Sequence, residues 1–392
     1  MSLMFGDVFV VAVPWTLLMI TLLITLLAAA VTAYEYVVKK NQPTPKLKDV
    51  AYKKVRRIAI LIASKNGEAT IAQTVQAARQ TGRQVYVVSD GSTDRTAQEA
   101  KQAGAQVLTL RKNIGKPSAL HRAYRHFELS QRFDAIAILD DDVNIEPDFI
   151  VRAKQKMVAD VAIAVGKNIT EWPAAKRWNI WLAARSYSYF CYQLTLRNLQ
   201  SAFNVMNCIS GSNSLYRVAV LDKVLKKHTP YIVDDTYWTL ETHRLKLGRI
   251  VYASQAVAWL QDPVNFKDWY KQNLRWMWGT FQGIFGHRIG SQFNRFHITY
   301  VLLMFEWVVY VASGPLCLWL LFESGIENLP RQLIILSAGY AIWVVVAAGS
   351  LKQPRLLFFI PVIVVIDFIF RALMVHAFFK ALRYKTVEAC VW

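Results

Sequence analysis

Long apolar segments at both ends of the chain constrain its fold more than any other feature of the sequence. Val8–Ala33 contains no charged residue, and an α-helix needs about 20 apolar residues to cross a bilayer. Three further apolar stretches lie near the C-terminus: Ile298–Phe322, Leu333–Ser350 and Leu356–Phe379. We therefore predict transmembrane α-helices at both ends, one within residues 1–36 and the others within 298–392.

Each of these segments has a second interpretation. Val8–Ala33 could be a cleaved signal peptide, which the small residues Ala28–Ala30 favour. However, Met1–Gly6 lacks the basic residues that begin such a peptide, and the apolar run is too long for one. The C-terminal stretches could be buried core helices, but their lengths and their closeness to the chain end favour membrane spans.

Basic residues follow the first apolar segment, in and just after a predicted juxtamembrane linker at 37–56. They are Lys39, Lys40, Lys46, Lys48, Lys53, Lys54, Arg56 and Arg57. Because basic residues beside a span mark the cytoplasmic side and attract anionic lipids, we predict a multi-pass protein of the cell membrane with a cytoplasmic central domain. The net charge of +19 could also indicate nucleic-acid binding. We predict no such partner, because no zinc-finger spacing or aromatic RNA-binding signature is present.

The charges near the C-terminus leave the number of spans open. Basic residues before and after the last apolar stretch both favour the cytoplasmic side; they are Lys352, Arg355, Lys380, Arg383 and Lys385. A single crossing cannot satisfy both groups, so either Pro361 breaks the segment into a hairpin or re-entrant piece, or the charge rule fails here. Asp367 and Arg371 lie four residues apart on one helix face. They form either a local ion pair or part of a translocation path.

The sequence of residues 57–262 predicts an α/β domain. Short apolar runs are expected to be strands at Ile58–Ala63, Gln84–Ser89, Gln106–Leu110, Ala135–Leu139 and Val161–Val165. Helical patterns lie between them near 68–80, 94–104, 116–129 and 147–158. Strands that alternate with helices predict a mostly parallel sheet, and ligands of such sheets bind at the carboxyl ends of the strands.

Polar residues follow four of the predicted strands. In chain order they are Ser64, Asn66 and Glu68, then Asp90, then Lys116, then Asp140, Asp141 and Asp142. The parallel arrangement brings these residues to one edge, where we expect a nucleotide site. Three adjacent carboxylates repel one another, so we predict a cation, Mg²⁺ or Mn²⁺, that bridges the phosphates of a nucleotide sugar. The alternative is an acidic first turn of the helix near Pro147.

Five motifs occur in order before the C-terminal apolar region. They are Ser89-Asp90-Gly91-Ser92-Thr93-Asp94, Asn113-x-Gly115-Lys116, Asp140-x-Asp142, Asp234-Asp235 and Gln272-x-x-Arg275-Trp276. Over residues 57–285 the chain resembles family 2 glycosyltransferases of the GT-A fold. The resemblance is to the membrane-bound branch with hyaluronan, chitin, cellulose and poly-N-acetylglucosamine synthases. Ser89 replaces an Asp of the family pattern, and Asp234 replaces a Glu.

The resemblance implies metal-dependent, inverting hexosyl transfer from a nucleotide sugar, with UDP as the expected nucleotide. Asp235 would be the catalytic base beside Asp234, and Arg275 would meet the diphosphate. Asp142 would ligate the metal together with Asp140. The other implied nucleotide-sugar contacts are Ser64, Asn66, Glu68, Asp90, Lys116, Asp140, Asp141 and Gln272, and the implied acceptor contacts are Ser210, Gly211, Ser212 and Trp276.

These residue types suit a direct displacement at an anomeric carbon. The attacking hydroxyl needs a general base, and the departing diphosphate needs cations such as an arginine fork. Trp276 offers a flat face to a sugar ring, although Trp also anchors helices at membrane boundaries. It lies in Phe266–Phe285, a predicted amphipathic helix of an interfacial region at 263–297. Trp172–Leu199 is expected either to pack on the sheet or to line the acceptor groove.

Three functions remain open from the sequence. The first is a processive synthase that extends and exports a β-linked polysaccharide, which the resemblance favours. The second is a single-addition transferase that glycosylates a membrane lipid, such as a polyprenyl phosphate or a sphingolipid. The third is a transporter or nucleotide sensor that binds its ligand without turnover. The expected partners are the nucleotide-sugar donor, a growing glycan or lipid acceptor, and membrane lipids.

Overall fold

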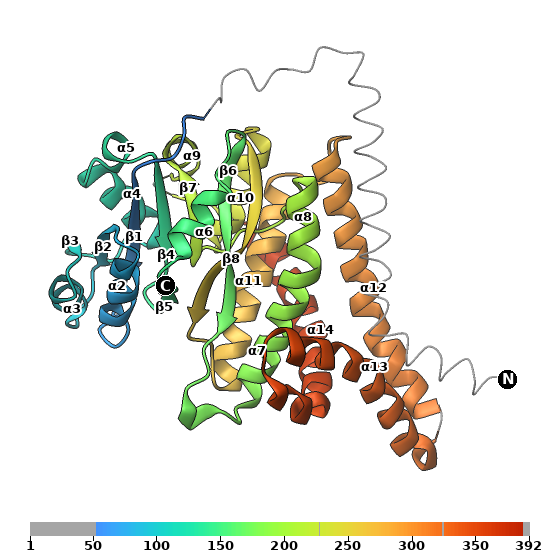
Figure 1. Cartoon of the computed structure of the whole chain (residues 1–392). Helices are drawn as coiled ribbons and strands as arrows, with labels where there is room; N and C mark the ends of the chain where they lie inside the picture. Colours follow the sequence, from blue (N-terminus) through green and yellow to red (C-terminus); the bar gives the residue numbers. More distant parts are fainter. Residues whose placement is uncertain (1–51, 227, 324, 387–392) are drawn as a thin grey trace.

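The computed structural model describes residues 52–386 except 227 and 324. The predicted N-terminal transmembrane helix and most of the basic linker lie outside the described residues. The described chain has a region built on a β-sheet and, beside it, long C-terminal helices (Figure 1).

One eight-stranded sheet has the order β3-β2-β1-β4-β7-β6-β8-β5. The five strands predicted from the sequence are β1 (Ile58–Ser64), β2 (Gln84–Asp90), β3 (Gln106–Leu110), β4 (Ala135–Leu139) and β6 (Val161–Thr170). Parallel pairs join β1 to β2 and β4, and β2 to β3. The prediction of a mostly parallel α/β sheet is therefore confirmed for this half of the sheet.

Three strands were not predicted: β5 (Val143–Ile145), β7 (Asn213–Arg217) and β8 (Arg249–Leu260). β7 lies antiparallel between β4 and β6, and β5 is antiparallel to β8. Only the β6–β8 pair in this half is parallel, so the sheet is mixed. Because β5 follows Asp142 directly, the acidic cluster does not form the first turn of a helix, and that interpretation is wrong.

Helices cover both faces of the sheet (Figure 1). α2 (Ile71–Gln80), α3 (Thr96–Gln102) and α6 (Phe149–Gln155) bury apolar residues against one face. The other face is covered by α4 (Lys116–His126), α5 (Leu129–Arg132), α9 (Val218–Val224) and α10 (Asp234–Arg244). The two clusters form the double core expected when both faces of a parallel sheet are covered.

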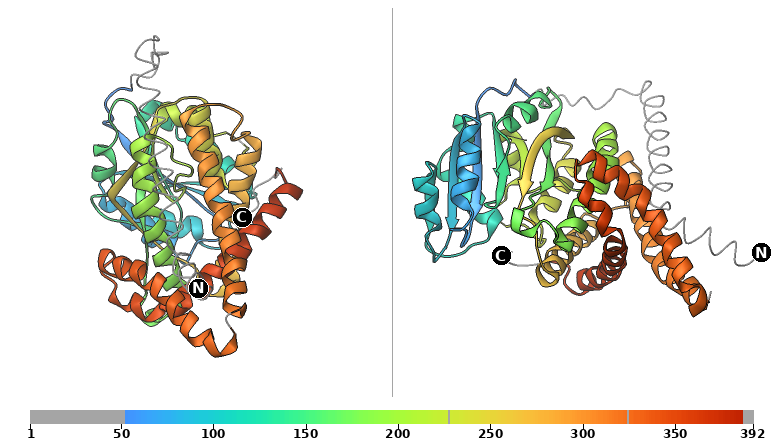
Figure 2. Two further views of the ribbon diagram at one scale, coloured as in Figure 1. Left: turned by 90° about the vertical axis from the view of Figure 1, so that its right-hand side faces the viewer. Right: turned by 60° about the horizontal axis from the view of Figure 1, so that its bottom comes forward.

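Three stretches are long and apolar enough to cross a membrane, judged by length and composition: Arg295–Leu320, Ile326–Ser350 and Pro354–Arg383. They contain α12 (Arg295–Glu323), α13 (Leu329–Ser350) and α14 (Ile360–Arg383). α7 (Ile180–Phe190) packs against α13 and α14, and α11 (Phe266–Gly286) packs against α12 and α14. A π-helical segment (Cys191–Arg197) and α8 (Asn198–Phe203) follow α7. Figure 2 shows the C-terminal helices on one side of the sheet region.

Both ends of the last apolar stretch contact the sheet region and α11. Before α14, the Arg355 guanidinium lies 4.0 Å from the ring of Trp172, which follows β6. At the other end, Lys380 lies 4.5 Å from the ring of Trp278 on α11. Basic groups on both sides of this stretch thus contact aromatic rings of the sheet region or of α11, and the number of membrane crossings stays a prediction. Pro361 lies in the first turn of α14, where no intrahelical N–H bond is lost, and a 3₁₀ helix (Pro354–Phe359) precedes it. The hairpin or re-entrant interpretation stays a prediction.

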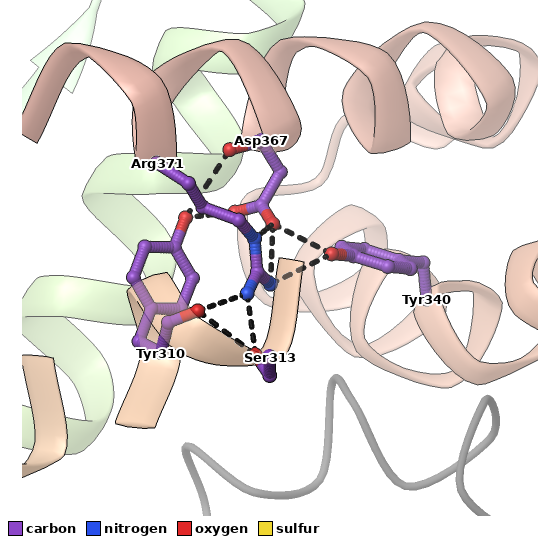
Figure 3. A network of polar contacts seen from close by, with 5 residues as sticks. All are labelled: Tyr310, Ser313, Tyr340, Asp367 and Arg371. Carbon is purple, nitrogen blue, oxygen red and sulfur yellow. Dashed lines mark hydrogen bonds and ion pairs between the residues drawn. The ribbon is translucent and has the colours of Figure 1, made fainter. Parts of the chain in front are cut away.

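The ion pair between Asp367 and Arg371 joins three helices (Figure 3). Arg371 Nη2 lies 2.9 Å from Asp367 Oδ2, and the hydroxyls of Tyr310 on α12 and Tyr340 on α13 each donate to Asp367 at 2.6 Å. Arg371 also donates to Ser313 Oγ at 2.7 Å. The prediction of a local ion pair is confirmed, and its partners satisfy charges that would be costly at membrane depth.

Candidate active site

The carboxyl ends of β1, β2 and β4 meet at one edge of the sheet, as the parallel pairing requires. Ser64 ends β1, and its hydroxyl donates to Oδ2 of Asp141, the second residue after β4. The Thr74 hydroxyl of α2 donates to the Asp141 carbonyl at 3.0 Å. Burial raises the pKa of Asp141, and the hydrogen bond from Ser64 opposes this shift. These contacts fix the start of the carboxylate cluster against β1 and α2.

Asn66 and Glu68 join the loop after β1 to the loop after β2. Asn66 Oδ1 accepts a hydrogen bond from the Thr93 amide at 3.0 Å, and Glu68 Oε2 accepts one from the Arg95 amide at 2.9 Å. The two side chains therefore shape this edge of the sheet. Their contact with a nucleotide sugar stays a prediction.

Asp90 fixes the turn that precedes Lys116. It is fully buried at the end of β2, and its two oxygens accept from the amides of Ile114 and Gly115 at 2.8 and 2.9 Å. Gly115 has a φ of 84°, which glycine adopts without a Cβ clash. Charge-assisted bonds of this kind are strong, so Asp90 holds the start of α4. Its contact with a nucleotide sugar stays a prediction.

Lys116 connects the carboxylates after β4 to those at the start of α10. Its Nζ forms an ion pair with Asp140 Oδ1. Burial acts to lower the pKa of Lys116, but the charges of Asp140, Asp234 and Asp235 together raise it above the ordinary value. The side chain is therefore a permanent positive charge among acidic groups.

Asp142 carries a carboxylate that is hard to ionise without a cation nearby. Burial, followed by the charges of Asp140 and Asp141, raises the pKa of Asp142 to about 8. Among the described residues, His, Cys, Asp and Glu side chains form no group of three or more able to hold a metal ion. Mg²⁺ is commonly bound by one or two carboxylates, with substrate phosphates as further ligands. Asp142 and Asp140 fit that type of site and do not form a complete protein cage.

The antiparallel pairing of β7 brings Ser210, Gly211 and Ser212 to the same edge. Leu139 of β4 pairs with Asn213 of β7, so the segment before β7 lies beside the end of β4. The Asp140 amide donates to the Ser212 carbonyl at 3.4 Å, and the hydroxyls of Ser210 and Ser212 lie 2.8 Å apart. The predicted acceptor residues thus lie next to the predicted metal carboxylates.

Asp234 and Asp235 occupy the first turn of α10. Asp235 Oδ2 accepts from the Gly211 amide at 3.1 Å, and a Cβ at Gly211 would lie 3.0 Å from the same oxygen. Burial, with the charge of Asp234 second, raises the pKa of Asp235 to about 6. Asp234 Oδ2 is buried and has no hydrogen-bond partner among the described residues. Asp235 is therefore a carboxylate whose pKa suits a general base near neutral pH.

α11 carries the Gln-x-x-Arg-Trp motif and begins at a side-chain cap, where Asn265 Oδ1 accepts from the Asp268 amide at 2.9 Å. Arg275 is exposed, and its charge acts to lower the pKa of Asp235, which indicates that the two groups are close. Gln272 is partly buried and Trp276 is half-buried on the same helix. The motif therefore lies close to Asp235, although the two are far apart in the sequence.

Three glycines allow α11 to approach α10 and the segment that precedes it closely. A Cβ at Gly279 would lie 2.4 Å from Val233 Cγ2, and one at Gly283 would lie 2.7 Å from Thr236 Cγ2. Gly286 follows on the same side of the helix. The glycines thus set the distance between the motif helix and the helix that carries Asp235.

Two buried residues of this site were missed by the sequence analysis. Arg185 on α7 and Asp262 after β8 form an ion pair of 3.3 Å, with each side chain only 2% exposed. The Arg185 Nη2 donates to Gln272 Oε1 at 2.5 Å. The available signal was the position of Arg185 inside an apolar and aromatic helical segment, Ile180–Phe190, since a buried charge needs a partner.

The sequence matches the family model described as "Glycosyltransferase like family 2" over residues 56–279. This chain belongs to glycosyltransferase family 2. The matched residues contain the whole edge described above, including α11 as far as Gly279. The chain is thus a glycosyltransferase, and the interpretation as a transporter or nucleotide sensor without turnover is not retained.

Several characterised proteins are similar to this glycosyltransferase. An N-acetylglucosaminyltransferase of Mesorhizobium japonicum is 29% identical over 215 residues, which are 51% of this chain and 49% of the relative. Hyaluronan synthase 2 of Homo sapiens is 23% identical over 203 residues, 47% of this chain and 36% of the relative. The chain spans about half the length, or less, of these relatives.

Among solved structures, glucosyl-3-phosphoglycerate synthase from Mycobacterium tuberculosis in complex with Mg²⁺ and UDP is 17% identical. The match covers 63% of this glycosyltransferase and 84% of that chain, with a TM-score of 0.40. The same enzyme was also solved with Mn²⁺ and UDP.

Proposed function

We propose that this protein is an inverting, membrane-embedded glycosyltransferase that takes sugar from a UDP-sugar and synthesises a β-linked polysaccharide, which it exports. The observation that carries the proposal is the convergence of Asp142, Lys116, Asp235 and the motif helix α11 at one edge of the sheet. This edge provides acidic, basic and aromatic groups together, as transfer from a nucleotide sugar requires. The names of the relatives, N-acetylglucosaminyltransferase and hyaluronan synthase, support a polysaccharide product.

Asp142 and Asp140 would hold the divalent cation, Mg²⁺ or Mn²⁺. When bound, the ion would supply Lewis-acid stabilisation of the diphosphate. Their fit rests on oxygen-only ligands and on the raised pKa of Asp142, which a neighbouring cation would lower. Ser64, Asn66, Glu68, Asp90 and Asp141 are proposed to form the nucleotide side of the site.

Asp235 would take the proton of the acceptor hydroxyl as its oxygen forms a bond to the anomeric carbon. The bond from that carbon to the diphosphate oxygen breaks in the same displacement, and the diphosphate leaves with the electron pair. Arg275 and Lys116 would stabilise its growing negative charge, because preorganised cations act most strongly where charge develops. One displacement inverts the anomeric centre, so an α-linked donor gives a β-linked product.

The acceptor is proposed to lie between Ser210–Ser212 and Trp276. The serine hydroxyls provide hydrogen-bond groups beside Asp235, and Trp276 provides an apolar face for a sugar ring. This arrangement would place an acceptor hydroxyl next to the base.

The protein is proposed to be a multi-pass membrane protein with residues 57–262 as its cytoplasmic catalytic domain, 263–297 as the interfacial region and 298–392 as the membrane region. α12 starts beside α10, where Phe296 stacks on His243 at 4.0 Å, and α13 ends at a cavity of about 110 Å³ that Ser350 shares with Lys167 of β6. Because the start of α12 and the end of α13 both lie against the sheet region, these two helices are proposed to cross the membrane in opposite directions. The exposed apolar residues Phe305 and Trp319 on α12 fit contact with lipid.

The proposal is tested by incubating the purified protein in nanodiscs with Mg²⁺ or Mn²⁺ and radiolabelled UDP-sugars, beginning with UDP-N-acetylglucosamine. The labelled product is then sized before and after digestion with specific glycosidases. A high-mass product that glycosidase degrades supports a polysaccharide synthase. Label confined to a small, organic-extractable species would replace the proposal by glycosylation of a membrane lipid.

A further inference from the structure

Arg185 on α7 contacts four residues that lie far from it in the sequence. Its Nε lies 3.3 Å from Asp262 Oδ1, Nη2 donates to Gln272 Oε1 at 2.5 Å, and Nη1 donates to Asn273 Oδ1 at 3.1 Å. The guanidinium carbon lies 4.6 Å from the ring centroid of Trp276. One buried side chain thus holds the first and last residues of the Gln-x-x-Arg-Trp motif.

The contact with Gln272 determines how its amide is oriented. An arginine has five N–H donors and no acceptor, so only the amide oxygen can face it. The Gln272 Nε2 group must therefore face away from Arg185 and can donate to another group. A donor at this place suits a negatively charged oxygen, such as one on a nucleoside diphosphate.

The contact with Trp276 determines the plane of the indole ring. A guanidinium within about 6 Å of an indole face is attracted to it, and arginine stacks as a flat plate. Arg185 therefore covers one face of the ring and resists its rotation. A sugar ring would bind to the opposite face.

Asp262 balances the charge of Arg185 in this buried place. Both side chains are 2% exposed, and the Tyr189 hydroxyl donates to Asp262 Oδ1 at 3.2 Å. Removal of one member of such a pair leaves an uncompensated buried charge, which is strongly destabilising. The ion pair with Asp262 therefore allows the charged guanidinium of Arg185 to be buried against α11.

We propose that Arg185 is a positioning residue for sugar transfer, which orients the Gln272 amide toward the donor and the Trp276 ring toward the acceptor. This inference rests on the proposed function. It assigns to α7 a direct effect on the site, beyond packing against the sheet and the membrane helices.

The test separates orientation from charge balance. Arg185→Met should lower both the unfolding temperature and the transfer rate, because Asp262 loses its partner. The double variant Arg185→Met/Asp262→Asn removes both charges and should recover most of the unfolding temperature. Its transfer should stay at least about tenfold slower, with a raised KM, because a displacement of about 1 Å can cost about 100-fold. The exposed Arg177, before α7, provides the matched control Arg177→Met, which should behave as wild type.

The assay uses whichever labelled UDP-sugar the wild type transfers, from UDP-N-acetylglucosamine, UDP-glucose, UDP-galactose and UDP-glucuronic acid. Recovery of both stability and transfer in the double variant would overturn the inference and leave the proposed function intact. If wild type transfers none of these sugars, the proposed function fails. Amide hydrogen exchange of residues 266–286 then tests whether Arg185 anchors α11. Faster exchange in the double variant than in wild type would support anchoring, and unchanged exchange would refute it.

Discussion

The substitution Gly279→Ala tests whether the distance between α10 and α11 determines activity. A Cβ at Gly279 would lie 2.4 Å from Val233 Cγ2 and 2.6 Å from Val233 Cβ, whereas ordinary contact begins at 3.4 Å. One of the two overlapping atoms is Val233 Cβ, which does not move when the side chain rotates, so a change of rotamer cannot remove the clash. α11 must therefore retreat by about 1 Å, since overlapping atoms repel steeply.

Arg275 lies one helical turn before Gly279, so it moves away from Asp235 with the helix. A displacement of about 1 Å can slow a reaction by about 100-fold, and overpacking typically destabilises a protein by about 1–3 kcal/mol. We expect both effects, measured as initial rates of sugar transfer at saturating donor and as the unfolding temperature in detergent.

Two further glycines provide graded controls. Gly283→Ala should have a smaller effect, because the nearest atoms are the ends of the Thr236 and Leu240 side chains. Gly349→Ala on α13 should leave transfer unchanged, because no atom lies within 4 Å of the added Cβ. Wild-type transfer by a correctly folded Gly279→Ala protein would refute the argument that close packing of α11 sets the site.

Three other predictions concern charged groups. Asp235→Asn should reduce transfer by about 10²- to 10⁴-fold, the usual contribution of a general base, yet retain UDP binding in equilibrium dialysis; unchanged transfer would exclude Asp235 as the base. In wild type, kcat/KM should rise with pH to a plateau, with a midpoint near the pKa of Asp235, about 6, because only the deprotonated carboxylate accepts a proton; a profile flat from pH 5 to 8 would contradict this. Asp367→Ala should destabilise the protein by about 3–5 kcal/mol by leaving the Arg371 charge buried without its ion-pair partner, whereas an unfolding temperature equal to that of wild type would show that water or lipid solvates this arginine.

The pH prediction has a counterpart in stability. The folded pKa of Asp235 is above its ordinary unfolded value, so the charged carboxylate destabilises the folded state at pH 7, and stability from this group is gained as pH falls through about 6. Asp235→Asn should therefore not lower the unfolding temperature at pH 7. This makes loss of activity in that variant interpretable as loss of the base.

Much of the fold could be predicted because its strands are buried on both faces. β1 and β4 consist almost entirely of apolar residues, and such runs between helical patterns indicate a covered parallel sheet. The three C-terminal helices were predictable for a related reason, since a membrane requires a continuous apolar length. The predicted Phe266–Phe285 helix and α11 also agree closely.

β7 was not predictable in the same way. Its residues Asn213–Arg217 are all buried although three of the five are polar, and the side chains of Asn213, Ser214 and Arg217 each donate hydrogen bonds. Arg217, for example, donates to the Val161 carbonyl at 2.7 Å and to the Met157 carbonyl at 2.9 Å. Hydropathy alone cannot distinguish such a strand from an exposed loop.

The sequence by itself determined which chemical groups are present, which segments can enter a membrane, and which strands are buried, because these properties depend on local composition and spacing. Only the tertiary structure decided which distant groups meet. The antiparallel register of β7 places Ser210–Ser212 beside Asp140, and buried Arg185 connects α7 to Gln272 and Trp276. Contacts of this kind depend on register and on how charges are paired after burial, and neither leaves a periodic signal along the chain.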